Sequence, residues 1–100
     1  MRAISLKIPS ALLADICRRH GVWRLSLFGS VLREDFGPES DIDVLVEFPE
    51  GQSPSLLELG GLQQELSCLL GREVDLKTPE FLSRYFRDKV IAEAVLQYAA

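Results

Sequence analysis

Two aspartates, Asp41 and Asp43, stand two positions apart at the start of an alternating apolar segment. This segment, from Asp41 to Phe48, predicts a β-strand that turns one set of apolar side chains to a single face: Ile42, Val44, Val46 and Phe48. Because side chains alternate along a strand, both carboxylates are expected on the opposite face. Like charges that close repel each other unless a cation neutralises them. Magnesium prefers carboxylate oxygens together with substrate phosphates, so the pair predicts a magnesium site.

A third aspartate, Asp75, lies in the segment Glu73–Lys77, which also predicts a strand. If the two strands are neighbours, Asp75 joins Asp41 and Asp43 in a cluster of three carboxylates. Such a cluster can hold two metal ions about 3.5–4 Å apart, which clamp the attacking and leaving oxygens of an in-line displacement. We therefore expect all three aspartates to bind metal, with Asp75 also a candidate acceptor for the proton of an attacking hydroxyl.

Gly29 and Ser30 are expected to supply the matching phosphate site. They follow the segment Trp23–Phe28, which predicts a strand. A glycine at a strand end lets the backbone approach a phosphate closely, and the N–H groups of a following helical turn point at the anion. The Ser30 hydroxyl adds a donor, and Arg33 is placed to steady the phosphate charge. The chain has no Gly-Lys-Ser/Thr sequence, so this is not a Walker A loop.

Each motif also has an ordinary structural alternative. Asp41 and Asp43 are compatible with a solvated strand edge, and Asp75 is compatible with a surface ion pair on the face that it shares with Lys77. The functional interpretation depends on the combination of motifs. Gly29-Ser30 is followed by ten residues and then by Asp-Ile-Asp, with a strand before each motif and a third acid downstream.

Taken together, these segments resemble the minimal nucleotidyltransferases of the polymerase-β-like superfamily. The resemblance is carried by Leu-Phe-Gly-Ser-Val-Leu-Arg at 27–33 and Ser-Asp-Ile-Asp-Val-Leu-Val at 40–46. Residues 73–76 are similar to the third-carboxylate strand of that family, and residues 81–88 to the closing helix of its bacterial members. One departure is Glu34, where many relatives carry glycine or another small residue.

The resemblance implies an α/β (α+β) fold of the polymerase-β palm type, with a small mixed sheet flanked by helices. It also implies a magnesium-dependent transfer of AMP from ATP to a hydroxyl, with two Mg²⁺ ions and pyrophosphate as the leaving group. Many members of the family are antitoxins encoded beside a HEPN-domain toxin, a small helical ribonuclease. They neutralise the toxin by binding it, by placing AMP on one of its tyrosines, or by both.

Two other functions remain open at this point. A catalytically silent module could neutralise a partner protein by masking it, with the carboxylates kept for metal binding alone. A transferase for a small hydroxylated molecule is the other alternative, although such enzymes usually carry an additional acceptor domain.

Composition narrows the class of protein. The 100 residues predict a single domain, 1–100, and 47% hydrophobic residues are enough for a core. The net charge of −4 argues against general nucleic-acid binding and favours encounter with a basic partner. The sequence begins without a signal-like segment and has no apolar run of about 18 residues, so we expect a cytoplasmic protein and no membrane association. Oligomers, with itself or with a partner, remain open.

Titratable residues exclude several enzyme classes. His20 is the only histidine, which rules out multi-histidine zinc sites and Ser-His triads. It follows two arginines and precedes Gly21, a pattern typical of the end of a helix. Cys17 and Cys68 have no metal-site or disulfide spacing and are expected to be buried thiols.

Three helices must position these residues. The first is predicted from the Ser10 cap to Gly21, with an apolar face of Leu12, Leu13, Ile16 and Cys17. The second is predicted to start at Ser53-Pro54 and to stop at Gly71, with a face of Leu59, Leu62, Leu66 and Leu69. The last is predicted to start at Thr78-Pro79 and to continue through Ala94, with Phe81, Tyr85 and Phe86 in the core and an Arg84–Asp88 pair on its surface.

Overall fold

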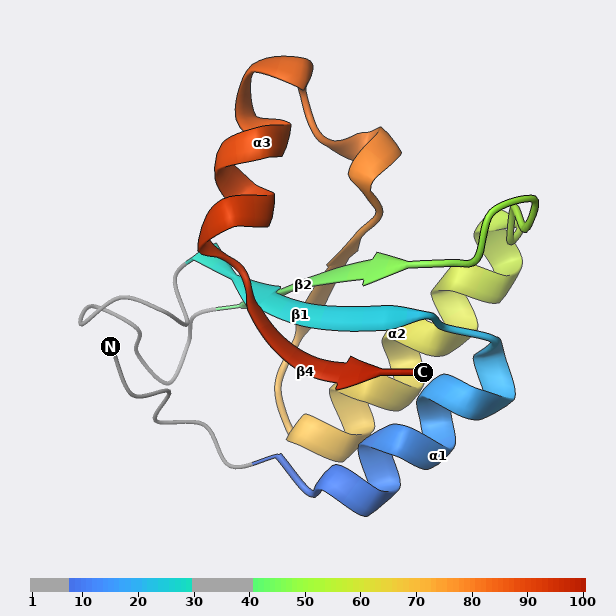
Figure 1. Ribbon diagram of the computed structural model, residues 1–100. Coiled ribbons are helices and arrows are strands. Elements are labelled where there is room, and N and C mark those ends of the chain that lie inside the picture. The colour runs from blue at the N-terminus through green and yellow to red at the C-terminus, as the bar shows by residue number, and fades with distance from the viewer. Residues whose placement is uncertain (1–7, 30–40) are drawn as a thin grey trace.

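The computed structural model describes residues 8–29 and 41–100 (Figure 1). Within these ranges the elements follow in the order α1 (Ser10–His20), β1 (Arg24–Phe28), β2 (Ile42–Glu47), α2 (Leu56–Leu70), β3 (Val74–Lys77), the 3₁₀ turn η2 (Pro79–Phe81), α3 (Arg84–Glu93) and β4 (Val95–Ala99). The strands form one sheet in the order β3-β2-β1-β4. β1 is antiparallel to β2 and to β4, whereas β2 is parallel to β3.

Helices α1 and α2 lie side by side across one face of the sheet, and α3 stands on the other side (Figure 1). The core fills the space between the sheet and the first two helices. Its fully buried members include Cys17, Leu25, Leu27, Ile42, Val44, Val46, Leu62, Leu66 and Val74. A small mixed sheet flanked by helices was predicted from the sequence, and it is confirmed. Within the described ranges, no helix has both the length and the apolarity to cross a bilayer.

Three of the four ends of α1 and α2 follow ordinary capping chemistry; at the fourth, Ser10 is the first residue of α1 rather than the predicted cap, and Pro9 precedes it without a side-chain cap. Gly21 adopts a left-handed conformation after α1 (φ 70°), and the N–H of Val22 bonds to the carbonyl of Cys17 at 2.9 Å. His20 is the last residue of α1, as predicted. The predicted start of α2 at Ser53-Pro54 is wrong, because Ser55 forms a complete capping box with Glu58, a stronger signal than a serine followed by proline.

The predicted last helix is broken into separate pieces. The chain is extended at Leu82, and Ser83 then caps α3 by accepting a hydrogen bond from the Tyr85 N–H at 3.3 Å. The Arg87 side chain bonds the carbonyls of Pro79 and Leu82 at 2.9 and 3.3 Å, which ties η2 to α3. The five residues Val95–Ala99, to which the sequence analysis assigned no element, form the edge strand β4.

Several expected core residues are exposed. Phe81, Tyr85 and Phe86 are exposed to 56, 87 and 62%, so their assignment to the core is wrong. Leu12, expected on the apolar face of the first helix, is also exposed, and so is Trp23. The guanidinium of Arg24 stacks over the Trp23 ring at 4.3 Å and covers part of it.

The two cysteines differ in environment. Cys17 is buried, and burial raises the pKa of its thiol to about 11, opposed by the charge of Arg18. Cys68 is exposed, so the expectation of two buried thiols holds for Cys17 alone. Only Cys68 is therefore open to solvent reagents.

Candidate active site

The sheet register brings two of the three predicted acids together. Asp43 is the second residue of β2 and Asp75 the second residue of β3, and they are direct partners in the parallel pair. Neighbouring strands lie roughly 4.8 Å apart, so the two residues start from adjacent backbone positions. Asp41 lies one residue before β2 and is exposed. The condition under which Asp75 was expected to join the other acids, that the third strand lies beside the second, is met.

The alternation of β2 sets the direction of these side chains. Ile42 and Val44 are fully buried on the side of α1 and α2, so Asp43, between them, faces the opposite side of the sheet. Leu45 continues that face and is 2% exposed, whereas Asp43 is half-buried. The acids therefore lie at one margin of this face, beyond its covered centre.

The carboxylates do not converge on a single point. Among the described residues, no three acidic, histidine or cysteine side chains lie close enough together to hold a metal ion. The ammonium of Lys77 lies 3.5 Å from Asp75 Oδ1, the surface pair considered as the alternative role for Asp75. Both partners are only half-buried and reach solvent, so this ion pair is worth little and is easily exchanged for another cation.

Gly29 packs directly against Asp43. Its φ of +73° is a left-handed conformation that favours glycine. A β-carbon at this position would overlap Asp43 Oδ2 and lie 3.1 Å from Asp43 Cγ. The end of β1 thus presents bare backbone to the carboxylate, as expected for a turn that a phosphate approaches. Ser30 and Arg33, the other predicted phosphate ligands, lie outside the described residues, and their roles stay predictions.

A hollow of about 490 Å³ lies at the other end of the sheet. The loop 49–54, the end of β2 and η2 line it, with Trp23, Phe48 and Phe81 among the aromatic side chains. Neither Gly29 nor the three aspartates contribute to it. The hollow is therefore distinct from the acidic margin.

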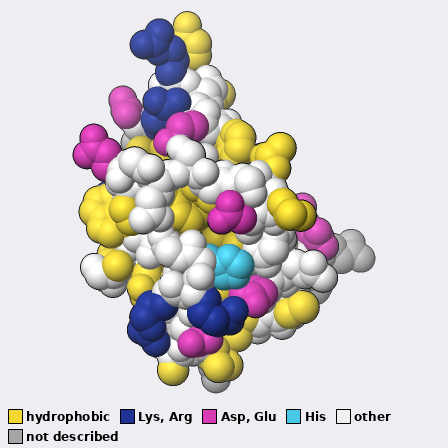
Figure 2. Space-filling view, turned by 90° about the vertical axis from the view of Figure 1, so that its right-hand side faces the viewer, with side chains coloured by type: hydrophobic (Ala, Val, Ile, Leu, Met, Phe, Trp, Pro, Cys, Tyr) yellow, Lys and Arg dark blue, Asp and Glu magenta, His cyan; other side chains and the backbone are white. Residues whose placement is uncertain are grey.

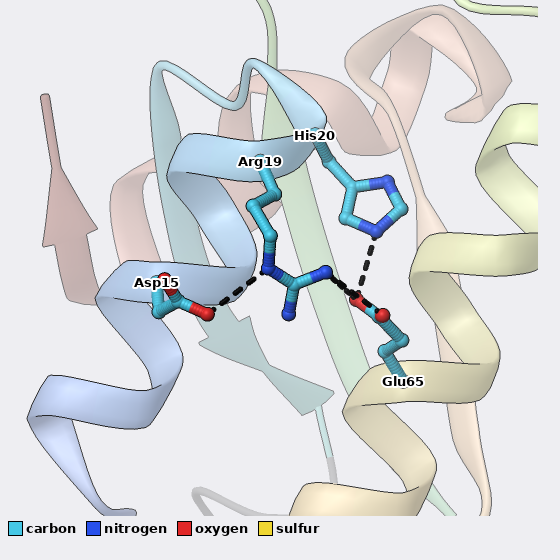
Figure 3. Close-up of polar contacts among 4 residues, drawn as sticks. All are labelled: Asp15, Arg19, His20 and Glu65. Atoms are coloured by element: carbon cyan, nitrogen blue, oxygen red, sulfur yellow. Dashed lines mark hydrogen bonds and ion pairs between the residues drawn. The ribbon is translucent and has the colours of Figure 1, made fainter.

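A second cluster of charges lies between α1 and α2 (Figure 3). The guanidinium of Arg19 bonds Asp15 at 3.0 Å and both carboxylate oxygens of Glu65 at 3.0 and 3.2 Å. His20 Nε2 lies 2.9 Å from Glu65 Oε2. The hydrogen bonds from Arg19 and His20 lower the pKa of Glu65. The cluster fastens one helix to the other, which agrees with the interpretation of His20 as a helix-end residue.

Sequence reasoning missed one neighbour of the site. β4 pairs with β1 so that Val95 lies beside Leu27, two residues before Gly29. The end of α3 is therefore held close to the turn that packs on Asp43. No glycine or proline separates α3 from β4, so the sequence offered no break signal there.

Comparisons with known proteins point to one family. The family model of the nucleotidyltransferase domain matches residues 10–97. The chain is 46% identical over 80 residues to MJ0435 of Methanocaldococcus jannaschii, a protein adenylyltransferase candidate, covering 80% of this chain and 84% of that protein. It is 37% identical over 81 residues to the protein adenylyltransferase MntA of Thermococcus cleftensis, covering 81% and 80%.

Solved structures give the same picture. A candidate minimal nucleotidyltransferase is 40% identical, with a TM-score of 0.70 over 85% of this chain and 84% of that one. A chain of a toxin–antitoxin complex with AMP-PNP has a TM-score of 0.74 and 20% identity, and the match covers 93% of this chain and 75% of that one. A chain of the complex of tri-AMPylated Shewanella oneidensis HEPN toxin with MNT antitoxin has a TM-score of 0.65 and 20% identity, and the match covers 91% of this chain and 70% of that one. At that identity, the last two likenesses show the fold alone.

Proposed function

Since the chain belongs to the nucleotidyltransferase-domain family and is a nucleotidyltransferase, we propose that it transfers AMP from ATP to a hydroxyl of a partner protein at the margin formed by Gly29, Asp43 and Asp75. The observation that carries the proposal is the contact of Gly29 with Asp43, beside Asp75 in the neighbouring strand. The backbone of Gly29, which a phosphate can approach, therefore lies next to carboxylates that can bind the metal counter-ion of that phosphate.

The donor set suits magnesium. Asp41, Asp43 and Asp75 offer only carboxylate oxygens, the ligands that Mg²⁺ prefers, and the Lys77–Asp75 pair is weak enough to yield. In this proposal the three aspartates hold up to two Mg²⁺ ions. Bound there, the metal neutralises charge on the phosphates and the leaving pyrophosphate.

The residues of the chain then have separate tasks. The backbone at Gly29, the Ser30 hydroxyl and Arg33 hold the terminal phosphates and orient the α-phosphorus. The acceptor oxygen attacks that phosphorus, and the bond to the pyrophosphate oxygen breaks. Asp75 is the candidate that takes the proton released by the hydroxyl.

We propose a tyrosine of a HEPN-type toxin as the acceptor, with the chain acting as its antitoxin. Support comes from relatives named protein adenylyltransferases and from a neighbour of the same fold seen with a tri-AMPylated HEPN toxin. We also propose that residues 1–100 form a single domain that acts in the cytoplasm. The second candidate, a silent module that masks the toxin, is favoured because no triad of carboxylates converges within residues 8–29 and 41–100.

The two candidates differ in one product. The purified chain is incubated with labelled ATP and the HEPN-type protein encoded beside its gene, with magnesium or with excess chelator. The proposal predicts label on a tyrosine of the partner, mapped by peptide mass spectrometry, and none with chelator. Silencing of the partner without label, in the presence of magnesium, would favour the masking module instead.

A further inference from the structure

An arm, defined here as residues 79–93 (η2 and α3), presents aromatic side chains to solvent. Phe81, Tyr85 and Phe86 are exposed to 56, 87 and 62%. Tyr85 and Phe86 are neighbours in the first turn of α3, whereas Phe81 lies in η2 and also lines the hollow. Large exposed apolar groups of this kind mark interaction surfaces. The arm is therefore a candidate contact surface rather than a piece of the core.

The arm has little tertiary packing to stabilise it. α3 is ten residues long and has no buried residue. It makes only sparse contact with the other described helices and strands, in contrast to α1 and α2, which pack on each other. Isolated helices shorter than about 12–15 residues are marginal in water. Hydrogen bonds of the Ser83 and Arg87 side chains to the backbone stabilise the conformation of the arm. Among the described residues, however, no helix or strand covers α3 enough to bury any of its side chains.

The C-terminal end of the arm stands next to the proposed transfer site, whereas η2 at its other end lines the hollow. Its last residue, Glu93, is followed by β4, whose Val95 pairs with Leu27 near the Gly29 turn. In Figure 1, α3 rises from the end of the sheet where β1 ends and β2 begins, on the side away from α1 and α2. At 1.5 Å per residue, the ten residues of α3 span about 15 Å from that end.

The composition of the arm fits the anatomy of a protein interface. Exposed charges of both signs, Arg84, Asp88 and Lys89, adjoin the aromatic side chains. Figure 2 shows basic and hydrophobic side chains together at the projection at the top of the molecule. Protein interfaces combine an apolar centre rich in aromatic residues with a polar rim. The predicted Arg84–Asp88 ion pair does not form among the described contacts, so these rim charges remain open to a partner.

The area is of the right size. At these exposures, the three aromatic side chains offer on the order of 400 Å² of surface. One partner contributes about 800 Å² to a standard interface. The arm therefore supplies roughly half of one side of such an interface, and the neighbouring margin of the sheet is available for the rest.

We propose that the aromatic face of the arm docks the protein that accepts the nucleotide, through an apolar face of that protein. This inference rests on the proposed function. A patch of about 800 Å² is roughly 30 Å across, so an interface centred on the start of α3 reaches the end of the sheet at which Gly29 and Asp43 lie. The docked protein is then held with its hydroxyl near the reacting phosphate, which supplies the orientation that the transfer needs.

A second copy of the chain is the main competing occupant. Two copies would each bring a net charge of −4 to the contact, which opposes association. A second copy over the arm would also cover the acidic margin, which must remain open to an acceptor. Both features favour the acceptor protein.

Two double variants separate docking from other effects. Tyr85→Ala/Phe86→Ala removes the aromatic side chains, and alanine favours a helix, so α3 is retained. The matched control is Leu56→Ala/Leu57→Ala in the first turn of α2, where the side chains are exposed to 79 and 87%. The probe is the HEPN-type protein encoded beside the gene, and the measurements are its dissociation constant, its adenylylation kinetics and the Mg-ATP affinity of each variant.

We expect the arm variant to bind the acceptor about 100-fold more weakly, the scale of an aromatic hot spot. The KM for the acceptor rises, whereas kcat at saturating acceptor and the Mg-ATP affinity stay within about twofold, because the arm does not touch the reacting atoms. The control variant behaves as the wild type in every measurement.

Three results would overturn the docking proposal. The first is wild-type acceptor affinity in the arm variant. The second is a change in oligomeric state by light scattering with acceptor binding unchanged, which would assign the arm to a second copy. The third is a wild-type chain that does not bind the acceptor. A wild-type chain that binds through the arm but transfers no AMP would instead refute the proposed function and leave the docking surface standing.

Discussion

At the scale of single residues, the contact between Gly29 and Asp43 links the phosphate turn to the acidic margin. The turn needs a glycine for two reasons, a positive φ and the lack of room for a β-carbon. The sequence predicted a close approach of backbone to phosphate, and the structure adds a close approach of backbone to carboxylate. Any side chain at position 29 would therefore move Asp43, and in the proposed site it would also obstruct the phosphate.

The two reasons can be separated by a matched pair of variants. Gly71 has a φ of +68° but open space around its missing side chain. Gly29→Ala and Gly71→Ala should both lose roughly 1 kcal/mol of stability from the left-handed backbone. Only Gly29→Ala should also weaken Mg-ATP binding, by about tenfold or more, as measured by calorimetry. Equal Mg-ATP affinity in the two variants would contradict a role for this turn in the site.

The surroundings of Asp43 and Asp75 show which features of the site could be predicted from the sequence and which could not. Alternation in the segment 41–48 was enough to place Asp43 opposite the core, because Ile42 and Val44 are both apolar. The pairing of Asp43 with Asp75 depended on strand order, which the sequence suggested only through the resemblance to a family. The Lys77–Asp75 contact depends on side-chain rotamers, which no pattern specifies.

At the scale of elements, the first two helices are fastened by Arg19, His20 and Glu65 (Figure 3). The pKa of Glu65 is lowered, first by the hydrogen bond from Arg19 and then by that from His20. A lowered pKa in the folded chain means that Glu65 stabilises the fold above the ordinary pKa of 4.5. That contribution disappears as the pH falls through the lower, folded-state value.

Glu65→Gln should therefore lower the Tm slightly at pH 7, and the difference from the wild type should vanish in acid, below the folded-state pKa of Glu65. The side chains are largely exposed, so the effect should also weaken at high salt. Thermal unfolding across this range of pH is the measurement. A difference that grows as the pH falls would show that the ion pairs are not its cause.

The sequence predicted elements unevenly along the chain. α1 and β1–β3 have clear periodicity and clear ends, and their predicted ranges differ from the structure by one residue at most ends. The C-terminal part was predicted as one long helix because its apolar residues recur at helical spacing. The periodicity of the arm is real, but its apolar side chains face solvent. Hydrophobic spacing predicts a helix and does not say what the helix packs against.

At the scale of the whole molecule, the residues of the hydrophobic core and the residues of the proposed site lie on different sides of the sheet. α1, α2 and the buried face of the sheet supply the core, and α3 lies on the other side of the sheet (Figure 1). The alternation of β2 places Asp43 on that other side as well. Substitutions in the proposed site should therefore leave the fold intact. Glu47 provides a matched control for Asp43, because it is a carboxylate on the same strand and the same face, at the opposite end of β2.

The most direct measurement of the central claim is the intact mass of the HEPN-type partner after co-expression with four versions of the chain. These are the wild type, Asp43→Asn, Asp75→Asn and the control Glu47→Gln. With the wild type and the control, the partner should gain the mass of one or more AMP units. With either aspartate variant, the modified fraction should fall by roughly 100-fold or more, because the metal-binding carboxylates are lost. An equal gain in mass with Asp43→Asn, or no gain with the wild type, would contradict the account.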